Sequence, residues 1–401
     1  MPLYVLFQAI PLPGIFVDLI SPARGALEQM LSGFDLQSTF NPVSVFPART
    51  LEHALRFVGY ALMLLMVREL AMRRGLGSWL LAAPLLAVAG MQALAGLFQV
   101  QGGDPVALGG YANRNHFAGL LELALPFAPA MSFAALQKSS ERSSTLDLRA
   151  ALLASLGWAL AALLMGGVLL SLSRAGFVIA LLGLAQVVLF RYVPLRLSVK
   201  DGLRNLGVLI ALLVILAAAI IFLPTDALID RFGDLAASDE ISHDSRVAMW
   251  TETLRLIKDY WLVGCGLGAY GSAFVAYRAS SPMFQIPYAH NDFLQYLGEL
   301  GVVGFAIGFV PIVILWVRLL RRFERERDAN VRCMALGCLV SMHSLALHSL
   351  VDFNLYIPAN ALIFAWVLGV SAALTQDDFS QNGGIPRQSR RKFMHSSRRP
   401  E

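Results

Sequence analysis

Apolar runs of about 20 residues recur along almost the whole chain, and they constrain the fold more than any other feature. A helix of that length crosses roughly 30 Å of hydrocarbon and satisfies its own backbone hydrogen bonds in lipid. Only 15% of the 401 residues are charged, whereas soluble domains average roughly 25%. The alternating pattern of an outer-membrane barrel is absent. The sequence therefore predicts an all-α fold, a polytopic membrane helical bundle.

The hydropathy pattern predicts about ten spans within a membrane domain that covers residues 1–374. The predicted spans are 2–20 (interrupted by Pro11 and Pro13), 54–71, 79–98, 116–136, 150–170, 174–190, 206–223, 292–319, 333–350 and 357–374. The first segment lacks the basic leader of a cleavable signal peptide. It resembles the end of an early span, so we expect the true start of the chain to lie upstream of Met1. Residues 375–401 are basic and rich in Ser, Gln and Gly, which predicts a disordered tail.

The distribution of Lys and Arg among the loops predicts the orientation in the membrane. One set of loops, together with the tail, contains 22 of the 32 basic residues, so this side and the C-terminus are expected to be cytoplasmic. These basic clusters lie at 68–74, 138–149, 191–204, 318–332 and 387–399. The opposite, periplasmic side receives 21–53, 99–115, 171–176 and a large loop, 224–290. Because the net charge of +5 follows this topology, we expect no nucleic-acid partner.

The large loop contains a predicted amphipathic helix, in "DSRVAMWTETLRLIKDYW", which would lie on the bilayer or over the bundle. Asp244 or Ser245 could cap its start. Its apolar stripe consists of Val247, Trp250, Leu254, Ile257 and Trp261.

The "GCGLGAYG" segment follows that helix and spells GxGxxG with Gly266, Gly268 and Gly271. A dinucleotide site needs this motif between a strand and a helix. Here a helix precedes it, on the side away from cytosolic nucleotides. We therefore expect a tight turn that brings backbone N–H groups close to a ligand or lipid.

Two arginines on the predicted periplasmic side are candidates for binding an anion. Arg174 lies at the tip of an apolar hairpin, where it either extends to lipid headgroups or binds a phosphate. Arg246 lies at a predicted helix start, where backbone N–H groups also favour an anion, or it is a solvated surface charge. Two such cations beside a lipid-facing cleft predict a lipid-linked phosphate or diphosphate.

His290 introduces a polar stripe at the start of an otherwise apolar span. Histidine can accept a proton from a hydroxyl near neutral pH, although it could simply cap the helix. Asp292, Gln295 and Glu299 share one helical face below it, which predicts that they face a cavity rather than lipid. The glycines farther along would allow a neighbouring element to approach closely: Gly301, Gly304 and Gly308.

Further polar residues lie at two other helix ends on the same side. "YANRNHFAG" contributes four candidate substrate-binding residues, which could equally cap a helix: Asn113, Arg114, Asn115 and His116. Asp352 could orient a histidine or an arginine.

His343 and His348 are expected to be hydrogen-bonded in the core. Metal ligation by His290, His116 and Asp352 is conceivable, but no short ligand spacing supports it. The three cysteines form no disulfide framework, and Cys333 and Cys338 read as small apolar residues within a helix.

Five blocks occur in an order and spacing that resemble the O-antigen ligase and O-antigen polymerase superfamily of bacterial inner-membrane glycosyltransferases. They are "NRNHFAG", "SLSRAG", "DSRVAMWTETLRLIKDYWLVGCGLGAYGSAF", "AHNDFLQYLGELGVVG" and "HSLVDFNLYIPANALIF". The resemblance implies a helical enzyme that uses an undecaprenyl-diphosphate-linked glycan as donor on the periplasmic side, without metal or nucleotide cofactor. The functional arginines of the family match Arg174 and Arg246, and its functional histidine matches His290. Members usually have about twelve spans, so this chain departs from the pattern at its N-terminus.

We expect from these residues a ligase that transfers the glycan to a hydroxyl of lipid A–core in lipopolysaccharide biosynthesis. Arg174 and Arg246 would bind the diphosphate, and His290 would remove the acceptor proton. Asp292, Glu299 and Asp352 are lesser candidates for orienting His290 or the sugar. The alternatives within the superfamily are a polysaccharide polymerase and a protein O-oligosaccharyltransferase. The alternative of another class is a transporter of a lipid-linked solute, although such proteins tend to place polar groups at mid-membrane.

Overall fold

The structure is a computed structural model that describes residues 1–32, 38–142, 147–192, 243–279 and 286–382. Helices dominate, and two short strands pair antiparallel near the N-terminus. The N-terminal elements are α1 (Pro2–Ala9), β1 (Leu12–Pro13), α2 (Gly14–Ile20), α3 (Pro22–Ser32), β2 (Phe40–Asn41), α4 (Pro47–Arg74) and η1 (Trp79–Leu81). Next come α5 (Ala83–Gln101), α6 (Arg114–Ala124), α7 (Phe127–Arg142), α8 (Leu148–Leu170) and α9 (Arg174–Tyr192). The C-terminal elements are α12 (His243–Asp259), α13 (Tyr270–Ala273), η3 (Phe274–Ala276), α14 (Asp292–Arg325), α15 (Ala329–His348), η4 (Asn354–Tyr356) and α16 (Pro358–Asn382).

Seven helical segments in the described part of the chain are long and apolar enough to cross a membrane, as expected of a multi-pass membrane protein. They are 83–101, 114–141, 148–170, 174–191, 292–325, 329–348 and 358–376. Each coincides with a predicted span. The predicted span 54–71 lies inside α4, which is not among the seven. The predicted span 206–223 falls outside the described residues.

The prediction of a span at 2–20 was wrong. The segment forms the eight-residue helix α1, a short strand and the helix α2, so no continuous helix crosses it. Pro11 and Pro13 explain the break, because proline lacks the N–H that a continuing helix needs. In the large loop, α12 begins at His243, so Asp244 and Ser245 lie in its first turn rather than before it.

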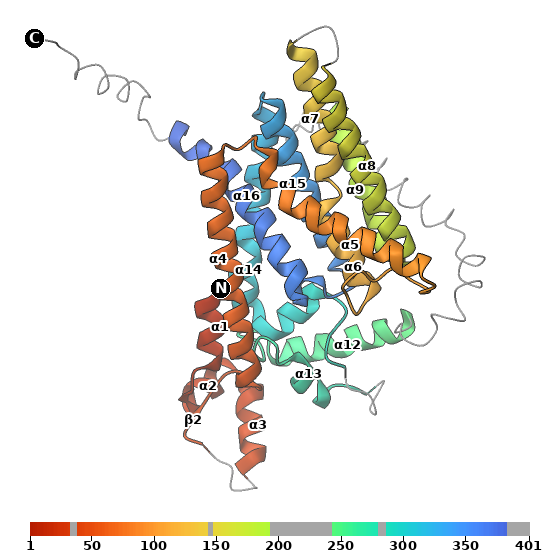
Figure 1. The fold of residues 1–401 in the computed structure, drawn as a ribbon. Coiled ribbons are helices and arrows are strands. Elements are labelled where there is room, and N and C mark those ends of the chain that lie inside the picture. The colour runs from red at the N-terminus through yellow and green to blue at the C-terminus, as the bar shows by residue number, and fades with distance from the viewer. Residues whose placement is uncertain (33–37, 143–146, 193–242, 280–285, 383–401) are drawn as a thin grey trace, which may run out of the picture.

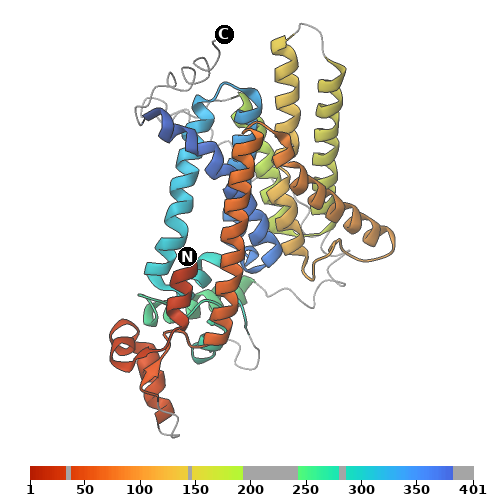
Figure 2. The same cartoon turned by 60° about the vertical axis from the view of Figure 1, so that its left-hand side comes forward.

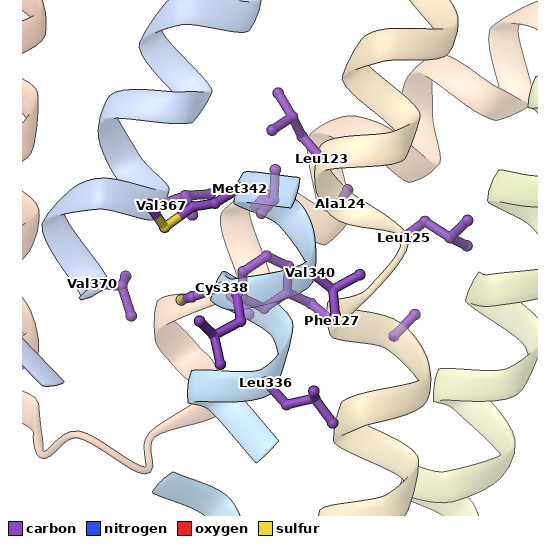
Figure 3. Packing of buried hydrophobic residues seen from close by; sticks show 14 of the residues in the cluster. Leu123, Ala124, Leu125, Phe127, Leu336, Cys338, Val340, Met342, Val367 and Val370 are labelled. Carbon is purple, nitrogen blue, oxygen red and sulfur yellow. The ribbon is translucent and has the colours of Figure 1, made fainter. Parts of the chain in front are cut away.

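The core of the bundle lies where α15 passes between α16 and the junction of α6 with α7. Leu125 and Phe127 flank Pro126 at this junction and pack with residues of α15 and α16 (Figure 3). The α15 residues in this core include Leu336, Cys338, Val340 and Met342, and those of α16 include Val367 and Val370. Cys333 and Cys338 are buried in α15, as predicted. This packing fixes the ends of α6 and α15 relative to each other.

One end of the bundle collects the starts of four helices beside α12 and α13. Figures 1 and 2 show α4, α6, α9 and α14 beginning at this end. The opposite end carries the end of α7, the start of α8 and the end of α16. This arrangement places the candidate site residues at the end that the basic loops predict to be periplasmic.

Helix α14 is broken at Gly301, and the turn after α12 fits into the break. Gly301 has φ 61° and ψ −178°, a combination that is accessible essentially only to glycine. The backbone N–H groups of Val302 and Val303 donate to the carbonyls of Trp261 and Leu262. In return, the N–H groups of Cys265 and Gly266 donate to carbonyls of α14, both at 3.0 Å. The break thus keeps its backbone groups paired, as burial requires.

Helix α1 docks onto the same break through two polar side chains. Gln8 is buried and donates to the carbonyls of Val263 and Glu299, at 2.7 and 2.8 Å. The Tyr4 hydroxyl contacts the carbonyls of Val263 and Leu300. The predicted packing role is confirmed here for Gly304. A side chain at Gly304 would meet the ring of Tyr4, so only glycine lets α1 come this close.

Candidate functional site

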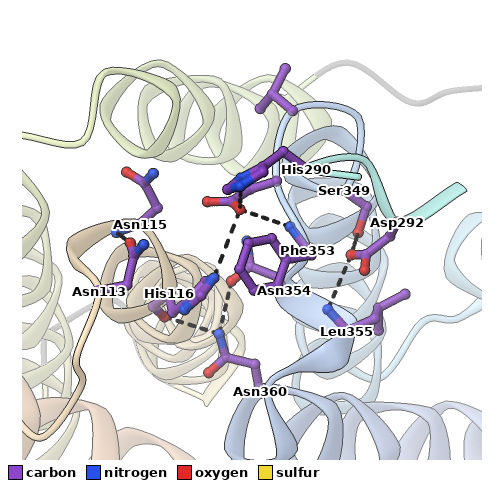
Figure 4. Close-up of polar contacts among 12 residues, drawn as sticks. Asn113, Asn115, His116, His290, Asp292, Ser349, Phe353, Asn354, Leu355 and Asn360 are labelled. Atoms are coloured by element: carbon purple, nitrogen blue, oxygen red, sulfur yellow. Dashed lines mark hydrogen bonds and ion pairs between the residues drawn. The ribbon is translucent and has the colours of Figure 1, made fainter. Parts of the chain in front are cut away.

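The carboxylate of Asp352 lies at the centre of the candidate site, between two histidines from distant parts of the chain (Figure 4). His290 Nδ1 lies 3.4 Å from Asp352 Oδ1, and His116 Nε2 lies 3.7 Å from the same oxygen. The backbone N–H of Phe353 donates to this oxygen at 2.9 Å. Burial alone would raise the pKa of Asp352, but the two histidines lower it well below its usual range. Asp352 is therefore an anion that can hold and orient imidazole rings.

His290 is held in an uncommon backbone conformation. Its φ is 48°, in the left-handed region that costs a residue other than glycine about 1–3 kcal/mol. Two hydrogen bonds to the preceding residue hold the segment: Ala289 donates to Gln295 Oε1 and accepts from Trp250 Nε1. The His290 side chain is 20% exposed, and Nδ1 faces Asp352. This leaves Nε2 as the nitrogen that can meet an incoming hydroxyl.

His116 approaches the carboxylate from the start of α6. The side chain of Asn113 caps this helix by accepting from the N–H of Asn115 at 2.7 Å. Asn360 donates to the His116 carbonyl at 2.9 Å and so joins α16 to α6. The ring of Phe353 packs edge to face against both His116 and His290, with centroids 4.6 and 4.8 Å apart. Among the predicted residues of "YANRNHFAG", His116 reaches the cluster, whereas Asn113 has a capping role and Arg114 and Asn115 lie half-buried in the first turn.

Asp292 has a structural position that the sequence did not predict. It is fully buried, and its Oδ2 accepts from the Ser349 hydroxyl at 2.7 Å and from the Leu355 N–H at 3.0 Å. The neighbouring Asn291 caps α14 and donates to the Leu350 carbonyl. These bonds fix the 349–355 turn that carries Asp352. The prediction that Asp292 faces a cavity was therefore wrong, because this turn covers its carboxylate.

Gln295 and Glu299, the lower part of the predicted polar stripe, do line a pocket. Glu299 is fully buried and accepts from the N–H groups of Gly268 and Tyr270 and from the Tyr356 hydroxyl. The carboxylate thus fixes the GxGxxG segment as the predicted tight turn. The prediction that its backbone N–H groups face a ligand or lipid was wrong, because those of Gly268 and Tyr270 donate to Glu299. Positive φ values at Gly266 and Gly268 allow this turn.

The two predicted cations lie at the same end of the bundle. Arg246, in the first turn of α12, approaches the Val351 carbonyl to 3.5 Å, next to Asp352 in the chain. Arg174 is the first residue of α9 and is exposed. Two residues later, Gly176 packs so closely on α6 that an added side chain would meet Ala118. Both cations therefore extend from elements that contact the Asp352 turn or the helix of His116.

A second carboxylate–histidine pair, which the sequence did not indicate as a pair, lies inside the bundle beside the site. Glu122 Oε2 and His348 Nδ1 are 3.0 Å apart, and both side chains are buried. The prediction that His343 and His348 are hydrogen-bonded in the core is confirmed, since His343 contacts Gln186 at 3.3 Å. A lone Glu122 inside an apolar span could have signalled a buried partner, because an unpaired carboxylate there is costly.

The face of α12 that packs on the protein differs from the predicted apolar stripe. Met249, Thr253, Leu256 and Tyr260 are buried, whereas Val247, Leu254 and Trp261 of the stripe are exposed. The predicted helix is thus confirmed. Its exposed apolar side remains free to contact the bilayer, as the sequence suggested.

His53, on α4 before the predicted span 54–71, makes the stability of the fold sensitive to acid. Burial lowers the pKa of His53 to about 4, and the nearby cations Arg56 and Arg49 add to this effect. In the unfolded chain this histidine gains a proton near pH 6.5, whereas in the folded protein it stays neutral down to about pH 4. The stability that neutral His53 contributes is therefore complete above pH 6.5 and is lost as the pH falls toward 4. We expect wild type to lose about 1–3 kcal/mol of stability over this interval. Thermal unfolding of wild type and His53→Gln at pH 7 and pH 4.5 checks this, and an equal acid loss in both would contradict it.

Comparison with known proteins gives one positive finding. Residues 159–309 match the family model described as O-antigen ligase. The matched segment includes Arg174, Arg246 and His290. No curated protein matches the chain. Within the described residues, no group of three or more His, Cys, Asp or Glu side chains is arranged to hold a metal ion.

Proposed function

We propose that this chain, whose residues 159–309 match the O-antigen ligase family model, transfers a glycan from a lipid-linked diphosphate to an acceptor hydroxyl. The donor would be undecaprenyl-diphosphate-linked glycan, at the periplasmic face of the bacterial inner membrane. The acceptor would be lipid A–core. The observation that carries this proposal is the approach of His290 and His116 to one buried carboxylate beside Arg246.

His290 would act as the general base. Asp352 orients its imidazole through Nδ1 and would stabilise the positive charge that the ring gains with the proton. The acceptor oxygen would then attack the anomeric carbon from the face opposite the diphosphate, with inversion. The bond from that carbon to the diphosphate oxygen breaks, and the lipid diphosphate leaves with the electron pair. Proton removal during attack commonly contributes 10²–10⁴-fold to a rate.

Arg174 and Arg246 would bind the diphosphate. Negative charge grows on the leaving diphosphate in the transition state, so cations placed there accelerate the reaction more than they strengthen ground-state binding. The guanidinium group can form two parallel hydrogen bonds to phosphate oxygens, which lysine cannot do.

We expect Arg174→Lys and Arg246→Lys each to lower kcat/KM for transfer about ten- to a hundredfold, corresponding to about 1.5–3 kcal/mol for a charged hydrogen bond. The measurement is transfer from purified lipid-linked donor by protein in detergent. Arg255→Lys, at an exposed position on α12, is the matched control and should behave as wild type. Normal turnover by both Arg174→Lys and Arg246→Lys would contradict bidentate recognition of the diphosphate.

The glycan phenotype of a deletion strain would distinguish this acceptor from the alternatives. Bare core with accumulated lipid-linked polymer supports the ligase. Single repeats still attached to core would point instead to the polymerase. An intact polysaccharide with unmodified target protein would point to protein O-glycosylation.

A further inference from the structure

A pocket of about 260 Å³ lies next to the Asp352 cluster but is separate from it. Its walls come from the first turns of α4, the 268–278 segment, the 286–288 segment and the upper part of α14. Ligand pockets are commonly about 300–1,000 Å³, so this one has room for a single sugar-sized group rather than a long chain.

The pocket wall has the mixed chemistry of a saccharide site. Tyr288 supplies an aromatic ring, and such rings offer a large apolar face with a polar edge. His53 also lines the pocket, and its lowered pKa of about 4 means that it is a neutral imidazole at physiological pH. A neutral imidazole offers one N–H donor and one nitrogen acceptor, which suits sugar hydroxyls.

Arg49 places a positive charge on the pocket wall. Arg278 also lines the pocket, from a different element. Glu299 is the acidic residue in the described wall, but its oxygens already accept from Gly268, Tyr270 and Tyr356. Guanidinium groups bind carboxylate and phosphate oxygens well, so the wall favours an anionic substituent on the sugar.

Two stacked aromatic rings separate the pocket from His290, the candidate base. Tyr288 stacks on Phe353 with centroids 4.1 Å apart and planes 11° apart. Phe353 in turn packs edge to face against His290 (Figure 4). The candidate donor cation Arg174 begins α9, which Figure 1 shows on the opposite side of the bundle from α4.

From these observations, we propose that this pocket binds an acidic sugar residue of the acceptor, close to the hydroxyl that meets His290. The inference rests on the proposed function in one respect, the assignment of the sugar to the acceptor. The acidic group is a carboxylate or a phosphate, which share the oxyanion chemistry that Arg49 would recognise. Binding of such a sugar here would place the acceptor on the side of the cluster away from the donor diphosphate.

The test is direct binding of small sugars to the purified full-length protein, by titration calorimetry in detergent. The probes are D-glucuronate, which carries a carboxylate, and D-glucose 6-phosphate, which carries a phosphate. Uncharged D-glucose is the control ligand. We expect at least one acidic sugar to bind about tenfold or more tightly than glucose, the ratio that one charged hydrogen bond supplies. The acidic sugar that binds more tightly identifies the substituent.

Two variants locate the binding. Ser272 is an exposed residue of the pocket wall, so Ser272→Trp should fill the pocket without disturbing the core and abolish acidic-sugar binding. Arg49→Gln should weaken the acidic sugar about tenfold and leave glucose nearly unchanged. Arg255→Gln, an exposed cation outside the pocket, is the matched control and should bind as wild type.

The proposal is overturned if wild type binds neither acidic sugar, or if Ser272→Trp binds them as wild type does. These results are independent of glycan transfer. A protein that binds acidic sugars in the pocket but transfers no glycan would sustain the site and contradict the proposed function. In a transfer assay, Ser272→Trp should raise the acceptor KM and leave the donor KM unchanged, which links the pocket to the acceptor.

Discussion

His290→Asn should lower the rate of glycan transfer by about 10²–10⁴-fold, the usual contribution of a positioned general base. Asparagine tolerates the left-handed backbone that His290 adopts, so this variant removes the imidazole while preserving the local fold. Donor binding should change little, because the proposed diphosphate ligands are arginines. The measurement is single-turnover transfer from purified donor, normalised to folded protein. Transfer at the wild-type rate would exclude His290 as the base.

Two further variants show that the effect belongs to the Asp352 cluster. Asp352→Asn keeps the shape of the side chain but removes the counter-charge for a protonated imidazole. We expect a lower kcat for transfer with little change in the donor KM, since the protonated ring that forms as His290 takes the acceptor proton is then less stable. His343→Ala, a histidine paired with Gln186 on α15, should retain the wild-type kcat.

Gly301→Ala should destabilise the protein by about 3 kcal/mol or more, the largest folding effect that we expect from a single methyl group. The backbone of Gly301 is essentially closed to other residues, which costs an alanine about 1–3 kcal/mol. In addition, the new Cβ would lie 2.4 Å from the carbonyl carbon and oxygen of Leu262. The turn after α12 would have to leave the break in α14, and it carries the loop that Glu299 fixes.

Gly308→Ala in the same helix is the matched control. A Cβ at Gly308 would meet nothing closer than 3.6 Å, and alanine is the better helix former by roughly 0.5–1 kcal/mol. The measurement is the midpoint of thermal unfolding in detergent, together with the folded fraction by size-exclusion chromatography. We expect Gly308→Ala to match or exceed wild type. If both variants unfold at the same temperature, the contacts between the turn after α12 and the break in α14 contribute little to the stability of the fold.

The spans could be predicted because each is a local property of the sequence. Runs of apolar residues fix the position of helices such as α8 and α15 to within a few residues of the structure. The same reasoning failed at 2–20, where mean hydropathy outweighed the two prolines. Helix α1 instead packs on the break in α14 through Gln8, whose partner Val263 is 255 residues away in the chain.

The candidate site could be predicted in part. His290, Arg174 and Arg246 were identified by their position at membrane boundaries and by the resemblance of five blocks. Their geometry could not be predicted, because it depends on contacts between separate helices. Asp352 meets His116 from α6, and Glu122 pairs with His348 at a sequence separation of 226. Asp292 and Glu299 share a helical face, yet one supports the Asp352 turn and the other supports the glycine loop.

Glycan transfer is tested most directly by reconstituting the purified protein in liposomes with an undecaprenyl-diphosphate-linked glycan and lipid A–core. Undecaprenyl diphosphate and glycosylated acceptor are then both measured. We expect that one lipid diphosphate is released for each glycan that becomes attached to the acceptor, and that His290→Asn forms neither product at a comparable rate. Donor that crosses the bilayer intact, with no diphosphate released, would contradict glycan transfer and indicate a transporter.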